Sequence, residues 1–341
     1  MLSRFREASS NLRWPRLAGF VLATALCSLL GSQKLGILVP GLSQAGQSCG
    51  QVGCHGTFVA AAPPGGNGIH VDVAPSARSL QLGQAISVTT TVTGGQTGPG
   101  SPGGFNSYLG AGIPTTRGSF VAGSSSRVSV LGTEITHTDS TWRAWTYGFK
   151  ASATTTGLVE MWVACLTADG DLMPTPNDLW AFHGYEGAAT TSTPVRLYVN
   201  AARVVPFGTA CVGSYGQHPV LGAPRSPNLG STTFTLELHG SAPLAPIALL
   251  LGANPAWTPL DLSVINAVGC TLWVDPQVSV ALATGPGNAQ RAEGSAVIGL
   301  PIPSSPGLSG ARLQVQVAIV DAANGRGVPI TMTNALDLTL Q

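Results

Sequence analysis

The chain has 341 residues, which is long enough for two domains that each bury a core of their own. Only 9% of its residues are charged and 44% are hydrophobic, which excludes a disordered, charge-rich chain. The formal net charge of +1 excludes a surface field that would attract nucleic acid or acidic substrates.

The N-terminal segment has the pattern of a signal peptide. Several arginines precede an apolar run at residues 17–30, and a weaker apolar run follows at residues 35–42. Small residues around Ala45 offer a cleavage site, so we expect residues 1–45 to be removed on export. An uncleaved anchor is the alternative, but residues 17–30 are short for a membrane span. We therefore expect a periplasmic, cell-surface or extracellular protein with no membrane span in the mature chain.

The mature chain would open on the stretch SCGQVGCHG at residues 48–56, which places Cys49, Cys54 and His55 close together. Two thiols followed by an imidazole can hold a covalently attached haem, but the usual spacing has two residues between the cysteines and this one has four. A small disulfide loop explains the same residues and is the interpretation that we favour. Zinc is a weaker alternative, because a fourth ligand is missing and exported proteins usually oxidise such thiols.

Period-two alternation predicts strands through the first half of the mature chain. Residues 86–92 alternate, and Trp145, Tyr147 and Phe149 share one face of a run at residues 142–149. At residues 158–166, Val159, Met161, Val163 and Cys165 share one face. Cys165 is therefore expected to be a buried, inert thiol.

The same pattern of short alternating runs separated by turns returns after a predicted linker at residues 201–206. Alternation at residues 234–238 and 312–320 predicts half-buried strands, and the apolar run at residues 247–251 predicts a central strand. No stretch after residue 46 has a convincing helical period. The 44 glycines and 25 prolines, without a collagen-like period, mark many turns. We predict an all-β fold of two antiparallel, immunoglobulin-like β-sandwiches at residues 46–200 and 207–341.

Other candidate sites carry weaker signals. Asp169, Asp171, Asn177 and Asp178 form an oxygen-rich loop that would suit calcium. However, aspartate and asparagine are also the residues that ordinary turns prefer, and the EF-hand spacing is absent.

His137 precedes the aromatic run and is the histidine best placed to complete a haem site. The simpler interpretation is a loop histidine bonded by the threonine or aspartate that follows it.

Cys211 and Cys270 are the only cysteines in the second domain, and an oxidising compartment would pair them as a disulfide. The mature chain has no H-E-x-x-H motif and no G-x-x-x-x-G-K-[ST] phosphate-binding loop. We therefore expect no enzyme activity, although a pair of convergent carboxylates acting on glycan would leave no such motif.

Residues 49–200 resemble the reelin-like domain of bacterial secreted proteins, the group called choice-of-anchor V. The resemblance implies an immunoglobulin-like sandwich on an exported protein, and the family also places a histidine near His137. The sequence departs from the family in the spacing of Cys49 and Cys54. The matching motifs are Cys…Cys-His-Gly at 49–56, Thr136-His137-Thr138, Trp142-Arg143-Ala144-Trp145, the run 157–162, Asp169-Gly170-Asp171 and Asn177-Asp178.

Residues 207–341 look like a C-terminal module of secreted proteins from planctomycete-type bacteria. The resemblance implies an accessory or attachment domain rather than a catalytic one. The matching residues are Phe207-Gly208, Gly213, the runs 249–252 and 259–262, Gly269-Cys270, Pro301-Ile302-Pro303 and Asn334-Ala335-Leu336.

Together these features predict an exported, non-catalytic protein for cell-surface attachment, adhesion or envelope structure. Its expected partner is a surface or envelope component, with no nucleic acid and no cofactor. The alternative is an electron-transfer protein with one covalent haem c on Cys49 and Cys54. His55 would then be one axial ligand and His137 the other, with Met173 as its rival.

Overall fold

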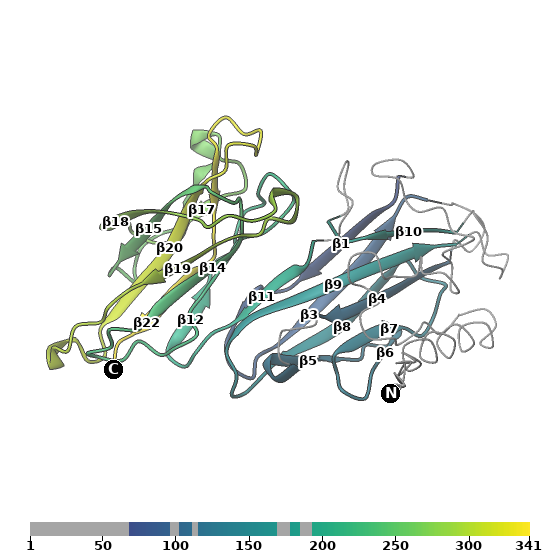
Figure 1. Ribbon diagram of the computed structural model, residues 1–341, viewed down its shortest axis with the longest axis horizontal. Helices are drawn as coiled ribbons and strands as arrows, with labels where there is room; N and C mark the ends of the chain where they lie inside the picture. Colours follow the sequence, from purple (N-terminus) through teal and green to yellow (C-terminus); the bar gives the residue numbers. More distant parts are fainter. Residues whose placement is uncertain (1–67, 96–101, 111–114, 169–177, 185–192) are drawn as a thin grey trace, which may run out of the picture.

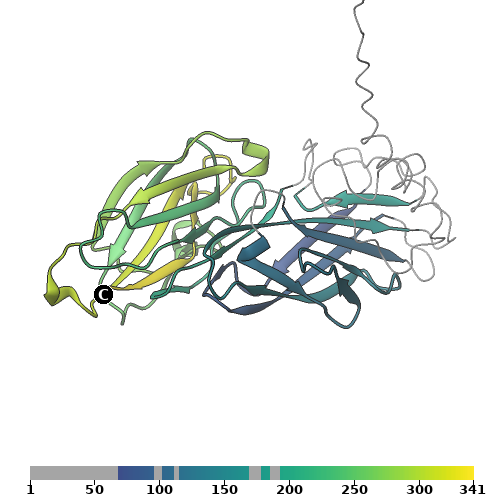
Figure 2. The same cartoon turned by 60° about the horizontal axis from the view of Figure 1, so that its bottom comes forward.

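The computed structural model describes residues 68–95, 102–110, 115–168, 178–184 and 193–341. This part of the chain is almost entirely β-structure, arranged as two sandwiches that lie side by side along the long axis of the molecule (Figures 1 and 2). The predicted all-β, two-sandwich fold is confirmed. No helix in the described ranges is long and apolar enough to span a membrane.

The first sandwich consists of two facing sheets. Neighbouring strands are antiparallel, except that β2 and β11 run parallel. The four-stranded sheet has the order β1 (His70–Pro75), β3 (Ala85–Thr93), β8 (Ala144–Ala151) and β5 (Gly118–Val121). The larger sheet has the order β2 (Ser79–Leu80), β11 (Val195–Val199), β9 (Gly157–Thr167), β4 (Gly103–Leu109), β7 (Glu134–His137) and β6 (Ser126–Val128), with β10 (Leu179–Phe182) also paired to β9.

The residues predicted to share one strand face form the core between these sheets. Trp145, Tyr147 and Phe149 of β8 are at most 2% exposed, and so are the odd-numbered residues of β9 from Val159 to Cys165. The Phe105 ring from β4 stacks on Tyr147 with ring centroids 5.2 Å apart. Alternation along β8 and β9 thus produces one aromatic core, which burial of apolar area stabilises.

The second sandwich pairs a large sheet with a small one. The larger sheet has the order β12 (Val204–Phe207), β22 (Ala335–Thr339), β20 (Arg312–Val320), β15 (Pro246–Gly252) and β18 (Val278–Ala283), with β21 (Ile330–Met332) also paired to β20. The smaller sheet contains β13 (Val220–Gly222), β14 (Thr235–Ser241) and β19 (Gly294–Gly299). The short pair is β16 (Leu260–Asp261) and β17 (Thr271–Leu272), and the 3-10 helices are η1 (Thr115–Arg117), η2 (Leu262–Ile265), η3 (Ala289–Arg291) and η4 (Pro306–Leu308).

The predicted central strand at residues 247–251 is β15, which pairs with β20 on one side and β18 on the other. A satellite core lies at one end of this sandwich, around Cys211, Cys270, Leu262 and Met332. The stretch expected as a linker contains the start of β12, because Val204 is buried in the second core and pairs with Leu338. The chain therefore crosses between sandwiches in a tight turn that ends at Arg203, whose φ of 64° is left-handed.

Candidate functional site between the two sandwiches

Asn200 holds the junction between the two sandwiches. Its side chain is fully buried, and its Nδ2 donates to Ser79 Oγ at 2.8 Å and to the Leu80 carbonyl at 2.9 Å, both in the first sandwich. Its Oδ1 accepts from the Ala223 amide of the second sandwich at 2.9 Å. Ser79 Oγ also donates across the junction, to the Leu221 carbonyl at 3.1 Å. One amide thus satisfies buried groups from both domains, which stabilises a single relative placement.

Tyr198 extends this contact into the smaller sheet of the second sandwich. Its hydroxyl donates to Glu237 Oε2 at 2.8 Å, and its ring lies against His239 with ring centroids 6.1 Å apart. Burial, followed by the Glu237 carboxylate, raises the pKa of Tyr198. Gly222 makes the approach possible, because a Cβ there would lie 1.9 Å from the tyrosine ring. The ring therefore fits only against a residue without a side chain.

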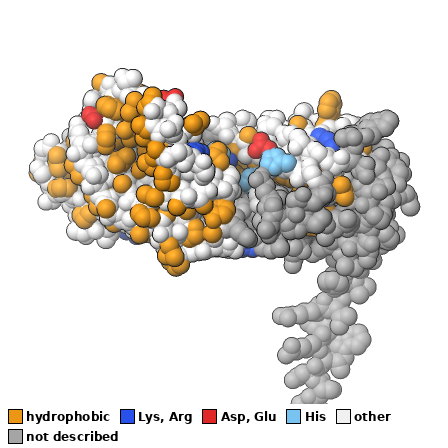
Figure 3. Space-filling view, turned by 90° about the horizontal axis from the view of Figure 1, so that it is seen from above, with side chains coloured by type: hydrophobic (Ala, Val, Ile, Leu, Met, Phe, Trp, Pro, Cys, Tyr) orange, Lys and Arg blue, Asp and Glu red, His pale blue; other side chains and the backbone are white. Residues whose placement is uncertain are grey.

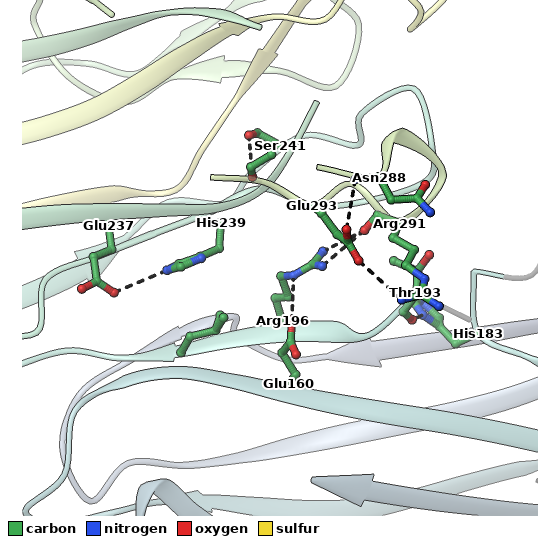
Figure 4. Close-up of polar contacts among 12 residues, drawn as sticks. Glu160, His183, Thr193, Arg196, Glu237, His239, Ser241, Asn288, Arg291 and Glu293 are labelled. Carbon is green, nitrogen blue, oxygen red and sulfur yellow. Dashed lines mark hydrogen bonds and ion pairs between the residues drawn. The ribbon is translucent and has the colours of Figure 1, made fainter. Parts of the chain in front are cut away.

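Arg196, two residues earlier on β11, is the charged group at the centre of the interface (Figure 4). It is 6% exposed, and its Nε lies 3.3 Å from Glu160 Oε1 on the neighbouring strand β9. Its two terminal nitrogens donate to the Arg291 carbonyl of the second sandwich, at 3.2 and 3.3 Å. Burial lowers the pKa of Arg196, and the Glu160 carboxylate opposes that shift. The guanidinium is therefore held by both domains.

A cavity of about 360 Å³, which we call the arginine cavity, opens beside Arg196. Arg196 and Glu160 form one ion pair in its wall, and Arg291 with Glu293 forms a second at 3.5 Å. Trp162, Leu158 and His239 also line it. The opposite charges within each ion pair cancel. These four residues therefore give the wall hydrogen-bonding groups but no net charge.

A second cavity of about 230 Å³, the histidine cavity, also lies between the sandwiches. His183 donates from Nδ1 to the Thr193 carbonyl at 2.9 Å, and His218 donates to the Ala210 carbonyl at 3.4 Å. Burial lowers the pKa of both histidines to about 4, and Arg78 acts in the same direction. Histidine and acidic side chains are visible side by side on the upper face in Figure 3. The cavity is lined in part by His70, Asp72, Arg78, His183 and His218.

Neither cavity assembles a metal centre in the described part of the chain, where no group of three His, Cys, Asp or Glu residues could hold an ion. The predicted haem or disulfide residues Cys49, Cys54 and His55 lie outside the described residues, and so does the predicted signal segment 1–45. Asp169, Asp171 and Asn177 of the predicted calcium loop also lie outside them. Asp178, directly before β10, is described and is 2% exposed.

His137 belongs to strand β7 and not to a loop. Its ring is 8% exposed and packs between Phe105 and Trp145, with centroid distances of 6.3 and 6.1 Å. The Phe105 amide donates to His137 Nδ1 at 3.0 Å. Nδ1 also lies 3.1 Å from the Phe105 carbonyl, so both polar groups of the Phe105 backbone contact this one ring nitrogen. A role as an iron ligand stays a prediction.

The predicted disulfide between Cys211 and Cys270 is confirmed, across 59 residues of sequence. It joins the segment after β12 to the segment before β17, inside the satellite core. Cys165 is fully buried, as expected.

The junction residues were not predicted from the sequence. One signal could have drawn attention to them, which is the basic residue Arg196 within the otherwise uncharged strand VRLYV at β11.

No protein-family model matches the chain, and no curated protein matches it. Among solved structures, the human F-spondin reeler domain is 14% identical over 40% of this chain and 91% of that domain, with a TM-score of 0.26. The Escherichia coli adhesin FdeC is 12% identical over 80% of this chain and 64% of its own, with a TM-score of 0.20. The Enterococcus faecalis protein ACE, described as binding ligands by a collagen hug, is 12% identical over 80% and 95%, with a TM-score of 0.21. Likeness at these values assigns neither a family nor a function, and the planctomycete-type module is not confirmed.

Proposed function

We propose that the protein is an exported, non-catalytic pair of β-sandwiches that acts in cell-surface attachment, adhesion or envelope structure. The observation that carries the proposal is the junction, where buried polar groups from both domains satisfy one another. A protein that transmits or resists force between a surface and a partner needs domains that keep their relative placement. The bonds of Asn200 and Arg196 supply that stiffness.

The polar side chains at the junction form hydrogen bonds to other residues of the protein. Arg196 donates to Glu160 and to the Arg291 carbonyl, and Tyr198 donates to Glu237. A general acid or base must be able to exchange a proton with substrate, and a nucleophile must be able to reach it. Groups bonded across the interface in this way stabilise the assembly instead. They support a structural or binding role over a catalytic one.

Export is supported by the arginine-rich, apolar N-terminus and by the Cys211–Cys270 disulfide, since such bonds persist in oxidising compartments. The resemblance of residues 49–200 to reelin-like domains, and of residues 207–341 to an attachment module, agrees with the same role. The attached partner would be a component of the cell surface or envelope.

Surface labelling of the native host tests this proposal. Intact cells would be treated with a membrane-impermeant biotin reagent, with a cytoplasmic protein as the negative control and lysed cells as the positive one. We expect the protein to be labelled on intact cells, and a deletion strain to lose adhesion or envelope integrity that the intact gene restores. A protein labelled only after lysis would contradict the proposal, and so would a deletion strain with unchanged adhesion and envelope.

A further inference from the structure

Strand β18 is an open edge of the second sandwich. Its only partner among the described strands is β15, so the opposite edge of its backbone is unpaired in the sheet. All six of its residues are exposed, with Val278 at 53%, Val280 at 41% and Leu282 at 39%. An edge strand with this much exposed apolar area offers both unpaired backbone groups and hydrophobic contacts to another strand.

The apolar side chains of β18 continue the core face of the larger sheet. Val280 pairs with Leu249 of β15, which is 2% exposed, and Leu282 pairs with Ile247, which is 3% exposed. Directly paired residues of antiparallel strands point to the same side of the sheet. The larger sheet thus extends its core face one strand beyond the part that the smaller sheet covers, and the apolar row on β18 is left in solvent.

The sequence of β18 lacks the features that keep natural edge strands from pairing with strands of other molecules. Soluble proteins usually protect such an edge with a charged side chain, an internal proline or a bulge. Residues 277–285 contain no charged residue, no histidine and no proline. The alternation VSVALA instead keeps one face apolar and the other small. A second copy of the same strand would therefore meet no like charge and would present the same apolar face.

The position of β18 leaves room for a second molecule. It lies at the outer edge of the second sandwich, on the side away from the first sandwich (Figure 1). The half of the molecule that contains the second sandwich also displays many hydrophobic side chains on the face in Figure 3. A copy that approaches this edge would extend away from the first molecule, with the two N-terminal sandwiches at opposite ends.

We propose that two copies of this chain pair through β18, antiparallel and related by a two-fold axis. With the two Val280 residues facing each other at the axis, Val278 of each copy lies opposite Leu282 of the other. This register keeps every apolar side chain on one face, because a shift by one residue would move them to opposite faces. The larger sheets of both molecules then form one continuous sheet, and the dimer is closed because the interface is the same on both sides.

Light scattering coupled to gel filtration, on the mature protein over a range of concentrations, tests the pairing. We expect a concentration-dependent dimer in the wild type. Val280→Lys places two ammonium groups face to face at the axis and should raise the dissociation constant at least about tenfold. Val297→Lys is the matched control, since Val297 is 71% exposed on β19, the edge of the smaller sheet, and should leave the dimer intact.

Leu282→Lys serves as a second variant, and circular dichroism with a thermal melt checks that each variant is folded. A wild type that is monomeric at every concentration would overturn the proposal. A folded Val280→Lys variant that dimerises as well as the wild type would also overturn it. Growth beyond the dimer with rising concentration would show an open-ended contact in place of the two-fold one.

Discussion

Replacing Asn200 by alanine tests the energetics of the junction. The side chain is fully buried and makes one hydrogen bond to the second sandwich and two to the first. Truncation leaves the Ala223 amide buried without its acceptor, which costs about 1–3 kcal/mol. The Leu80 carbonyl still accepts from the Asn200 backbone amide at 2.8 Å, and Ser79 Oγ still donates to Leu221. Losing the Asn200 side-chain bonds to these two groups therefore costs only the net contribution of two hydrogen bonds to the free energy of unfolding. The expected loss in the free energy of unfolding is about 2–6 kcal/mol.

Urea unfolding of the mature wild type and variant, followed by circular dichroism and by tryptophan fluorescence, measures this loss. Because the lost bonds couple the two sandwiches, we also expect the variant to unfold in two separate steps. Asn228→Ala is the control, since Asn228 is exposed in the second sandwich and its change should stay within about 0.5 kcal/mol. A loss below about 1 kcal/mol, or one equal to the control, would refute the role assigned to Asn200.

Three further predictions concern other parts of the structure. Removing the Cys211–Cys270 disulfide by changing both cysteines to alanine should destabilise the second sandwich by about 4 kcal/mol, because the bond closes a separation of 59 residues; an unchanged urea midpoint would contradict this. The folded-state pKa of about 4 for His183 and His218 lies below the unfolded value of about 6.5, so the unfolded chain binds more protons between these values and stability should fall as the pH is lowered from about 6.5 to 4. The double glutamine variant should flatten that dependence in pH-resolved urea titrations, and an identical slope would argue against it. Gly222→Ala should lower stability by about 1–3 kcal/mol through a clash with the Tyr198 ring, whereas Gly299→Ala, with open space around it, should be tolerated; equal melting temperatures would count against the clash.

Strand periodicity was enough to predict β8, β9 and β20, because each has one buried and one more exposed or polar face. It could not predict the role of β11, whose five residues are all buried. One face of β11 packs in the first core and the other meets the second sandwich, so the alternation disappears. The site at the junction is built from this strand, and its chemistry depends on contacts between residues far apart in sequence.

His137 and β18 illustrate two other limits. The His137 ring contacts the backbone of Phe105, 32 residues away, which no local pattern can show. The alternation of β18 is typical of a strand with one buried face, but its apolar face is exposed because the opposing sheet has fewer strands. The disulfide was predictable by contrast, since counting cysteines in one domain left a single pairing.

The distance between the two sandwiches is the most direct test of the fixed junction on which the proposed function depends. Nitroxide labels on p-acetylphenylalanine at positions 142 and 264, both exposed and in different sandwiches, allow that distance to be measured by double electron–electron resonance in the mature protein. We predict one narrow distance distribution for the wild type and a broader one for Asn200→Ala. A wild-type distribution as broad as that of two domains on a flexible tether would contradict the account.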